Sequence, residues 1–201
     1  MTKLRVAGTV VESQLPGHDF ALEFNSPELK FEEIKALPEA TTTAPTTDWL
    51  KLAKTYKERG NVLFRTKNDL GLAATAEYKK ALHCLRRVPR AQVEVYSLRV
   101  QLYVNLSACD LAGGDYSACR RHATKAITLD AGNVKALYRR SVARRYAGFD
   151  LPGAESDLVA ALSASTSDKE REMLARNLAE LRHDRERSLA SEAEAARRMF
   201  Q

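Results

Sequence analysis

The 201-residue sequence lacks the patterns that mark a metal site, a disulfide framework or a membrane span. Its three cysteines show no C-x-x-C spacing, which favours reduced thiols in a cytoplasmic protein over disulfides. Its four histidines form no zinc-binding pattern, so no metal is expected. No run of about 18 apolar residues occurs, and residues 1–8 lack the apolar core of a secretory signal. We therefore predict no contact with membranes and a location in the cytoplasm, with the nucleus as an additional site.

Catalytic signatures are missing as well. The chain contains neither a G-x-S-x-G nucleophile motif nor a G-x₄-G-K phosphate loop. We predict that it is not an enzyme and that it needs no cofactor. What it does have is an uneven distribution of charge. Residues 1–48 carry a net charge of −4, residues 49–164 carry +10 and residues 165–201 are neutral. The basic middle of the chain predicts an acidic partner for that part.

The first 47 residues are interpreted as an extension followed by a linker. Apolar residues alternate with other types over residues 20–24, which predicts a short strand that pairs with residues 4–11 as a hairpin. A Ser-Pro pair at residues 26 and 27 predicts the start of a helix that ends near residue 37. Residues 38–47 hold two prolines and five threonines without an apolar period, as is typical of a flexible linker.

The rest of the chain is predicted to be helical. Residues 48–164 contain six helical segments in pairs, and the breaks between them fall at residues 68–71, 88–89, 113–115, 130–133 and 148. Residues 165–201 predict a seventh helix that begins with a capping box of Ser167 and Glu170. Its apolar stripe should dock on the last pair, whereas the part after His183 should project as a lone helix. The stripe consists of Leu174, Leu178 and Leu181.

The paired helices repeat at a fixed period. Arg139 follows Asn105 by 34 residues, and Asn105 follows Asn61 by 44, which is one period plus ten. Thirty-four residues is the tetratricopeptide period, so we predict an all-α fold of three such repeats, a solenoid closed by the C-terminal helix. The ten additional residues are interpreted as a lengthened second helix over residues 83–95. The second helices carry small, large and small packing residues in register: Ala74-Tyr78-Ala81, Cys119-Ala123-Ala126 and Ala154-Leu158-Ala161. The second repeat matches this pattern less well, because Ala123 stands where an aromatic residue is usual.

Polar residues recur at two places on the first helix of each repeat, four residues apart and therefore on one face. With Gly60 at place 8, places 5 and 9 are held by Lys57, Asn61, Asn105, Lys135 and Arg139. The first helices line the concave side of such a solenoid, so these side chains should converge on one groove. Basic pairs on the second helices should face the convex side, and no aromatic residues alternate with them as a nucleic-acid site requires. These pairs are Lys79-Lys80, Arg86-Arg87 and Arg120-Arg121. Arg144-Arg145 is expected at the edge of the groove.

The segments Tyr56–Asn61, Asn105–Ala108 and Lys135–Arg140 resemble the dicarboxylate clamp of chaperone-binding tetratricopeptide domains. That family binds the C-terminal Glu-Glu-Val-Asp of the ninety- and seventy-kilodalton heat-shock proteins. The resemblance covers residues 49–182 and implies roles for five residues: Lys57, Asn61 and Asn105 on the terminal main-chain carboxylate, Lys135 on the last aspartate side chain, Arg139 on the backbone or an upstream glutamate. A handful of charge-assisted hydrogen bonds, less the ordering of a flexible tail, gives an affinity of about −8 kcal/mol.

The long final helix and the extended junction between repeats one and two resemble the C-terminal half of immunophilin co-chaperones. Only about 48 residues precede the repeats here, which is too few for the isomerase domain of that family, so isomerase activity is not expected. We predict a monomeric co-chaperone adaptor that favours the ninety-kilodalton chaperone and binds a second protein or client through residues 1–37 or the final helix. The alternatives are a truncated or degenerate prolyl isomerase and a general scaffold that binds another acidic peptide.

Overall fold

A computed structural model describes residues 46–66, 71–147 and 150–199 of the chain, and every regular element in these ranges is helical. The hairpin and helix expected within residues 1–37, and residues 38–45 of the expected linker, lie outside the described residues. Thr46 and Thr47 belong to the first helix rather than to a linker. The helices are α2 (Thr46–Thr66), α3 (Leu72–Cys84), α4 (Val93–Ala112), α5 (Tyr116–Leu129), α6 (Val134–Ala147), α7 (Leu151–Ala164) and α8 (Asp168–Met199), with a 3₁₀ turn η1 (Leu85–Arg87) after α3.

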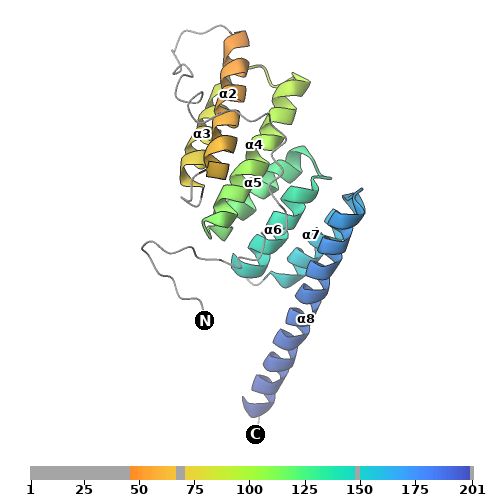
Figure 1. Ribbon diagram of the computed structural model, residues 1–201. Coiled ribbons are helices and arrows are strands. Elements are labelled where there is room, and N and C mark those ends of the chain that lie inside the picture. The colour runs from red at the N-terminus through yellow and green to blue at the C-terminus, as the bar shows by residue number, and fades with distance from the viewer. Residues whose placement is uncertain (1–45, 67–70, 148–149, 200–201) are drawn as a thin grey trace.

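The helices form a stack of antiparallel pairs. The pairs α2–α3, α4–α5 and α6–α7 follow one another along a single direction, and α8 packs on the last pair and continues beyond it (Figure 1). This arrangement confirms the predicted all-α solenoid of three repeats with a C-terminal capping helix. Within the described ranges no helix is long and apolar enough to cross a membrane.

Short polar side chains begin three of the helices, at the breaks that the sequence predicts. Asp115 accepts a hydrogen bond from the Ala118 amide at 2.8 Å. Asn133 accepts from the Ala136 amide and Asp150 from the Gly153 amide, each at 3.0 Å. Each such cap satisfies one amide that has no partner inside the helix, and contributes about 1 kcal/mol. The second helices of repeats two and three, and the first helix of repeat three, therefore start where the cap residue dictates.

The ten additional residues of the first repeat do not lengthen its second helix, and that interpretation was wrong. The α-helix α3 ends at Cys84, followed by η1 and an extended residue, Val88, with φ −103° and ψ 138°. Pro89 explains the change, because the helical conformation is disfavoured for a residue that precedes proline. The additional residues thus form a 3₁₀ turn and a link, and the helix α4 starts at Val93.

The small-large-small residues of the second helices lie in the core, as predicted. The alanines and Cys119 of these sets are no more than slightly exposed, and both Tyr78 and Leu158 are buried. The three cysteines are free and buried. Burial raises the pKa of the Cys119 thiol to about 12, so this thiol stays protonated and unreactive in the folded domain.

A charged or titratable side chain precedes the middle packing residue of each second helix, and each pairs with the first helix of its own repeat. In repeat one Glu77 lies 3.1 Å from Arg59 Nε, and in repeat two His122 Nδ1 lies 2.6 Å from Asp110. In repeat three Asp157 is buried and receives two hydrogen bonds from Arg140, at 2.9 and 2.6 Å, and a third from Arg144 at 2.9 Å. These second-helix residues are Glu77, His122 and Asp157. Each repeat is therefore held by a polar pair beside its core.

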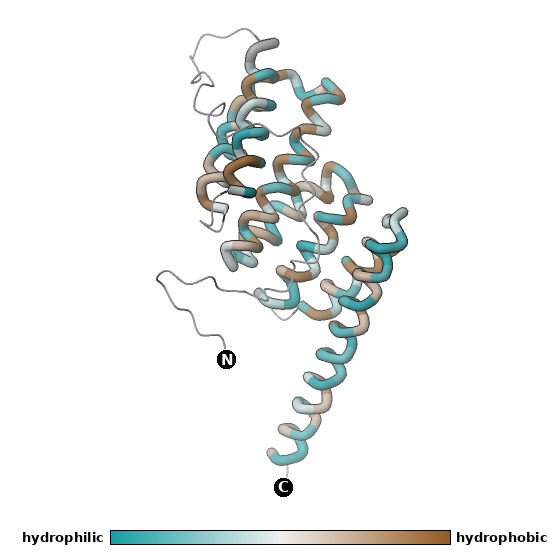
Figure 2. Tube along the Cα trace, in the orientation of Figure 1, coloured by the Kyte–Doolittle hydropathy of each residue, from teal (hydrophilic) through white to brown (hydrophobic). Residues whose placement is uncertain are grey.

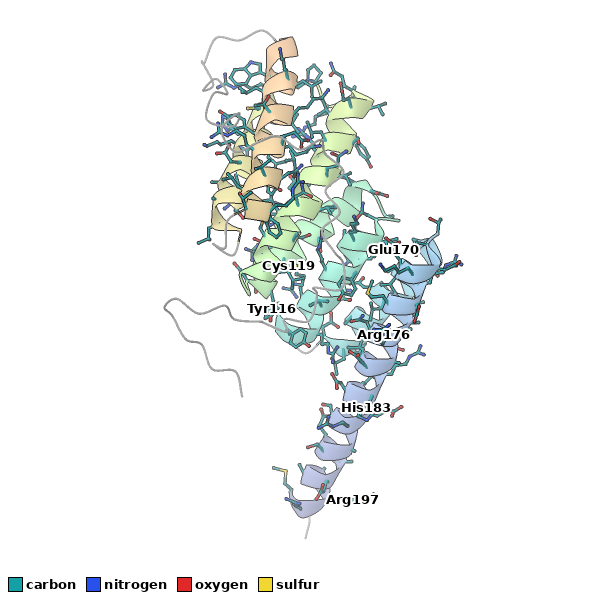
Figure 3. The ribbon with its side chains drawn as sticks, viewed as in Figure 1. Tyr116, Cys119, Glu170, Arg176, His183 and Arg197 are labelled. Atoms are coloured by element: carbon teal, nitrogen blue, oxygen red, sulfur yellow. The ribbon has the colours of Figure 1, made fainter. Side chains whose placement is uncertain are left out.

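The helix α8 docks through the predicted stripe, because Leu174, Leu178 and Leu181 are all buried. Beyond Leu181 every described residue is exposed except Asp184, which is partly buried. This part of α8 is mostly hydrophilic and extends past the other helices (Figure 2), and Figure 3 places His183 and Arg197 along it. The predicted projection of the helix after residue 183 is confirmed.

Two local predictions near α8 need correction. Ser167 Oγ lies 3.5 Å from the Glu170 amide, but the Glu170 carboxylate accepts from the Ser165 hydroxyl at 2.9 Å, so the capping box is only half formed. The pair Arg144-Arg145 does not lie free at a groove edge. Arg144 binds Asp157 of α7, and Arg145 binds Asp184 of α8, so their charges are neutralised inside the fold. Arg145, which the sequence pattern assigned to the groove edge, therefore helps to hold α8 against the last repeat.

The ion pairs between α7 and α8 predict a pH dependence of stability. Glu155 accepts from Arg182 at 2.8 Å and from Arg185 at 2.9 Å, and these contacts lower its pKa. Because the folded pKa lies below the unfolded value of 4.5, the stabilisation is complete above pH 4.5 and disappears as the pH falls through the folded pKa. We expect Glu155→Gln to lower the free energy of unfolding by about 0.5–1 kcal/mol at neutral pH, and not at acid pH. Urea titrations at both pH values measure this, and the exposed Glu186→Gln serves as control. A loss that persists unchanged at acid pH contradicts the prediction.

Candidate functional site

The candidate site is built on α2, where Lys57 and Asn61 lie one turn apart. The Lys57 side chain is 18% exposed, and its Nζ donates to Gln101 Oε1 of α4 at 2.8 Å. The same Nζ lies 3.1 Å from Glu58 Oε1. Lys57 is therefore held between its own helix and the first helix of the next repeat, with its charge near the surface.

Asn61 is buried at 2% exposure, and its carboxamide has a fixed orientation. Its Oδ1 accepts from the Tyr78 hydroxyl at 2.9 Å and from Asn105 Nδ2 at 3.0 Å. Its Nδ2 donates to Glu58 Oε2 at 3.0 Å. Because the oxygen is engaged by two donors, turning the amide around would break both bonds. The amide nitrogen must therefore face Glu58.

Tyr78 reaches Asn61 because α2 carries a glycine where the two helices approach. A Cβ atom on Gly60 would lie 2.4 Å from Tyr78 Cε1, so only glycine leaves room for the ring. Tyr78 is fully buried, and this burial raises the pKa of its phenol, which stays protonated as the donor to Asn61. The packing of repeat one and the geometry of the site are therefore linked through one side chain.

The second and third repeats supply Asn105 and Lys135. Asn105 is half-buried on α4, next to Asn61, so the structure brings together two predicted residues that are 44 positions apart. Lys135 lies in the first turn of α6, which Asn133 caps, and is half-buried. It forms no ion pair or hydrogen bond with a described side chain. A lysine in a first helical turn opposes the helix dipole, so its charge is better satisfied by an added anion than by the helix itself.

Arg139 is buried, like Asn61 and unlike the other three predicted residues, which are partly exposed. It is 4% exposed, and its Nη1 donates to the Val104 carbonyl of α4 at 2.8 Å. Burial lowers its pKa to about 10, so the guanidinium stays charged at neutral pH. In this conformation Arg139 joins α6 to α4 beneath the site and does not extend toward a ligand. The reason is that the carbonyl of Val104 offers it an acceptor inside the solenoid.

Two residues of the site were not among the predicted ones. Gln101 holds the Lys57 ammonium, and Glu58 contacts both Lys57 and Asn61. A signal for Gln101 was present, because it follows Lys57 by the same 44 residues that separate Asn61 from Asn105. Glu58 also had a signal, because it precedes Asn61 by three residues, a spacing that brings side chains together on a helix.

The chemistry of this arrangement is that of anion binding. The Lys57 ammonium and the Asn61 and Asn105 amides lie together between α2 and α4, and a carboxylate is an anion that such donors bind. No group of three or more histidine, cysteine, aspartate or glutamate residues within the described ranges is arranged to hold a metal ion.

Comparisons with known proteins agree with this fold. No family model matches the sequence. The chain is 35% identical over 118 residues to the FK506-binding protein-like protein of Mus musculus, an alignment that covers 59% of this chain and 32% of that protein. It is 30% identical over 93 residues to the Hsp70/Hsp90 co-chaperone CNS1 of Saccharomyces cerevisiae, covering 46% and 22% of the two chains. The chain thus spans a third or less of the length of these curated relatives.

A solved structure provides a fuller match. The C-terminal tetratricopeptide-containing domain of a protein described as an FK506-binding protein of Plasmodium falciparum superposes with a TM-score of 0.56 at 28% identity. The match covers 70% of this chain and 97% of that domain. From these similarities and the stacked helix pairs, the described part of the chain is a tetratricopeptide solenoid that resembles the C-terminal half of FK506-binding immunophilin co-chaperones.

Proposed function

We propose that this domain is a non-enzymatic adaptor that binds the acidic C-terminal tail of a heat-shock chaperone, ending in Glu-Glu-Val-Asp, with the ninety-kilodalton chaperone favoured. The observation that supports it most directly is the hydrogen bond of 3.0 Å between Asn61 and Asn105. It joins two places of the clamp pattern from successive repeats and sets them beside Lys57. The similarity to a yeast protein described as an Hsp70/Hsp90 co-chaperone supports the same class of partner.

A chain end is the ligand that uses the whole site. A terminal aspartate carries two carboxylates a few ångströms apart, which an internal residue does not. In the proposal, the main-chain carboxylate binds at Lys57, Asn61 and Asn105, and the aspartate side chain binds at Lys135. Charge-assisted hydrogen bonds of this type contribute about 1.5–3 kcal/mol each. Because the groups are partly exposed, binding should weaken as salt is added.

Arg139 has a different role in this proposal from the one its register place implies. Its guanidinium lies beneath the site and bonds the Val104 carbonyl. There it keeps α6 at a fixed distance from α4, and thereby sets the separation between Asn105 and Lys135. Its charge also adds to the positive potential that a carboxylate meets. Direct contact with the peptide would require its side chain to leave this carbonyl.

The test is a peptide titration. We expect a peptide that ends in Glu-Glu-Val-Asp to bind with a dissociation constant near the micromolar range, about −8 kcal/mol. Lys135→Ala should weaken binding about tenfold, because it removes one charge-assisted contact. Lys79→Ala on α3 removes the same charge from an exposed position and is the matched control. Fluorescence anisotropy measures the dissociation constants of the wild type and of the two variants. Equal affinity of the wild type and Lys135→Ala, or no binding below millimolar concentration, would contradict the proposed clamp.

A second titration separates a chain-end receptor from a general acidic-peptide scaffold. Amidation of the peptide's C-terminus removes the main-chain carboxylate and leaves every side chain unchanged. Binding should then be lost at concentrations that saturate the free acid, because Lys57 and the two asparagines lose their ligand. Undiminished binding of the amide would favour the scaffold. A proline-isomerisation assay on the same protein tests the enzymatic alternative, and we expect the uncatalysed rate.

A further inference from the structure

A carboxylate of the chain itself occupies the donors of the proposed site. Glu58 Oε1 lies 3.1 Å from Lys57 Nζ, and Glu58 Oε2 accepts from Asn61 Nδ2 at 3.0 Å. Each oxygen of one carboxylate is thus engaged by one of the donors that the proposed function assigns to the peptide's terminal carboxylate. The free protein presents a site that already contains an anion.

The helix geometry and its neighbours enforce this contact. Glu58 follows Lys57 directly and precedes Asn61 by three residues, a spacing that brings side chains together on a helix. Tyr78 and Asn105 hold the Asn61 oxygen, so the amide nitrogen cannot turn away from Glu58 without breaking two hydrogen bonds. The Glu58 side chain is 25% exposed, which leaves it a path into solvent when another anion arrives.

Within the described ranges, no internal carboxylate contacts the rest of the site. Lys135, which the proposed function assigns to the aspartate side chain, forms no ion pair with a described carboxylate. The neighbouring pair of Lys54 and Glu94 links α2 to α4, but it involves none of the proposed clamp residues. Competition is therefore confined to the half of the site that would bind the main-chain carboxylate.

We propose that Glu58 is an internal competitor for the ligand's terminal carboxylate, an inference that rests on the proposed function. Two carboxylates that share the same donors repel each other, so a bound chain end displaces Glu58 toward solvent. Every ligand must therefore supply the free energy that is needed to displace Glu58. A single carboxylate on an unrelated acidic protein gains too little to do so, whereas a terminal aspartate that also engages Lys135 gains more. Glu58 thereby sets the threshold of affinity for recognition.

The test compares Glu58→Gln with the wild type. Glutamine keeps the length of the side chain and an oxygen that accepts from Asn61, while it removes the charge and replaces the oxygen beside Lys57 by an amide nitrogen. The dissociation constant of the free-acid peptide should fall about fivefold, because the competing anion is gone. Glu94→Gln removes one carboxylate from the nearby ion pair that Glu94 forms with Lys54 between α2 and α4, and should change affinity less than about twofold. Equal or weaker binding by Glu58→Gln, or an equal gain in both variants, overturns the proposal.

A second measurement does not depend on the peptide. Sodium acetate, the simplest carboxylate, is titrated while the side-chain amide of Asn61 is followed by ¹H–¹⁵N NMR. The Asn61 signal should respond at lower acetate concentration in Glu58→Gln than in the wild type, and identical responses overturn the proposal. If neither protein binds the peptide but the acetate difference is present, the proposed function fails and the competition by Glu58 stands.

Discussion

Replacing Gly60 by alanine is expected to lower the free energy of unfolding by about 3 kcal/mol. The new methyl carbon would lie 2.4 Å from Tyr78 Cε1 and 2.7 Å from Cδ1. The Tyr78 ring cannot move aside easily, because it is fully buried and packs in the core of repeat one. Any shift of the ring also lengthens the hydrogen bond from its hydroxyl to Asn61. The variant should therefore lose peptide affinity along with stability.

Gly132→Ala is the matched control for this substitution. Gly132 lies in the turn before α6, where an added Cβ meets nothing closer than Asp130 Oδ1 at 3.9 Å. Alanine there removes only the flexibility of the unfolded chain, and stability should stay within about 1 kcal/mol of the wild type or rise slightly. Guanidinium titrations followed by circular dichroism measure both proteins. If the two variants lost the same free energy of unfolding, the close approach of α2 and α3 would not be a determinant of stability.

Asp157→Ala is expected to lower the free energy of unfolding by about 3–4 kcal/mol, because it takes the carboxylate partner from Arg140 beside the core and leaves Arg144 with only Asp150 and the Gly153 carbonyl. The Asp157 side chain is 4% exposed and neutralises two arginines, Arg140 on the middle of α6 and Arg144 a turn later. Arg140 binds it through both carboxylate oxygens. Without the aspartate, water cannot fully solvate either arginine, because the Arg140 and Arg144 side chains are only 17% and 24% exposed.

A double-mutant cycle shows whether this loss comes from the ion pair. When Arg140→Met is combined with Asp157→Leu, both charges disappear and apolar groups of similar length replace them. We expect the double variant to be at least about 1 kcal/mol more stable than the sum of the single changes allows. Thermal unfolding of the four proteins provides the measurement. Strict additivity would mean that Asp157 acts through its volume alone.

The repeats could be predicted from sequence because their determinants are local. The small and large residues of each second helix, and the cap residues Asp115, Asn133 and Asp150, act within a few positions of themselves. The period of 34 residues then places the first helices without any knowledge of packing. By the same arithmetic Asn61 and Asn105 were placed together, and the hydrogen bond between them agrees with that register.

The failures concern side-chain choices that several helices make jointly. Arg139 has the right register place, but the Val104 carbonyl of another repeat draws its guanidinium inward. Arg144 was assigned to the groove, yet Asp157 of α7 binds it. Glu58 turns toward Asn61 because Tyr78 and Asn105 fix the amide. In each case a residue of another helix decides the final orientation, so the periodicity of one helix could not reveal it.

The hydrogen bonds that join successive first helices have a consequence for the synthesis of the chain. Asn61 needs Asn105 of the second repeat, and Val104 receives Arg139 of the third. A nascent chain that ends before α6 has neither Lys135 nor the arginine that spaces the helices, so it would present an incomplete anion site. In the proposed function, capture of a whole terminal aspartate also needs Lys135, so it would require that translation and folding have passed the third repeat. Such a ligand would bind complete molecules in preference to truncated ones, without contacting the end of the truncated chain.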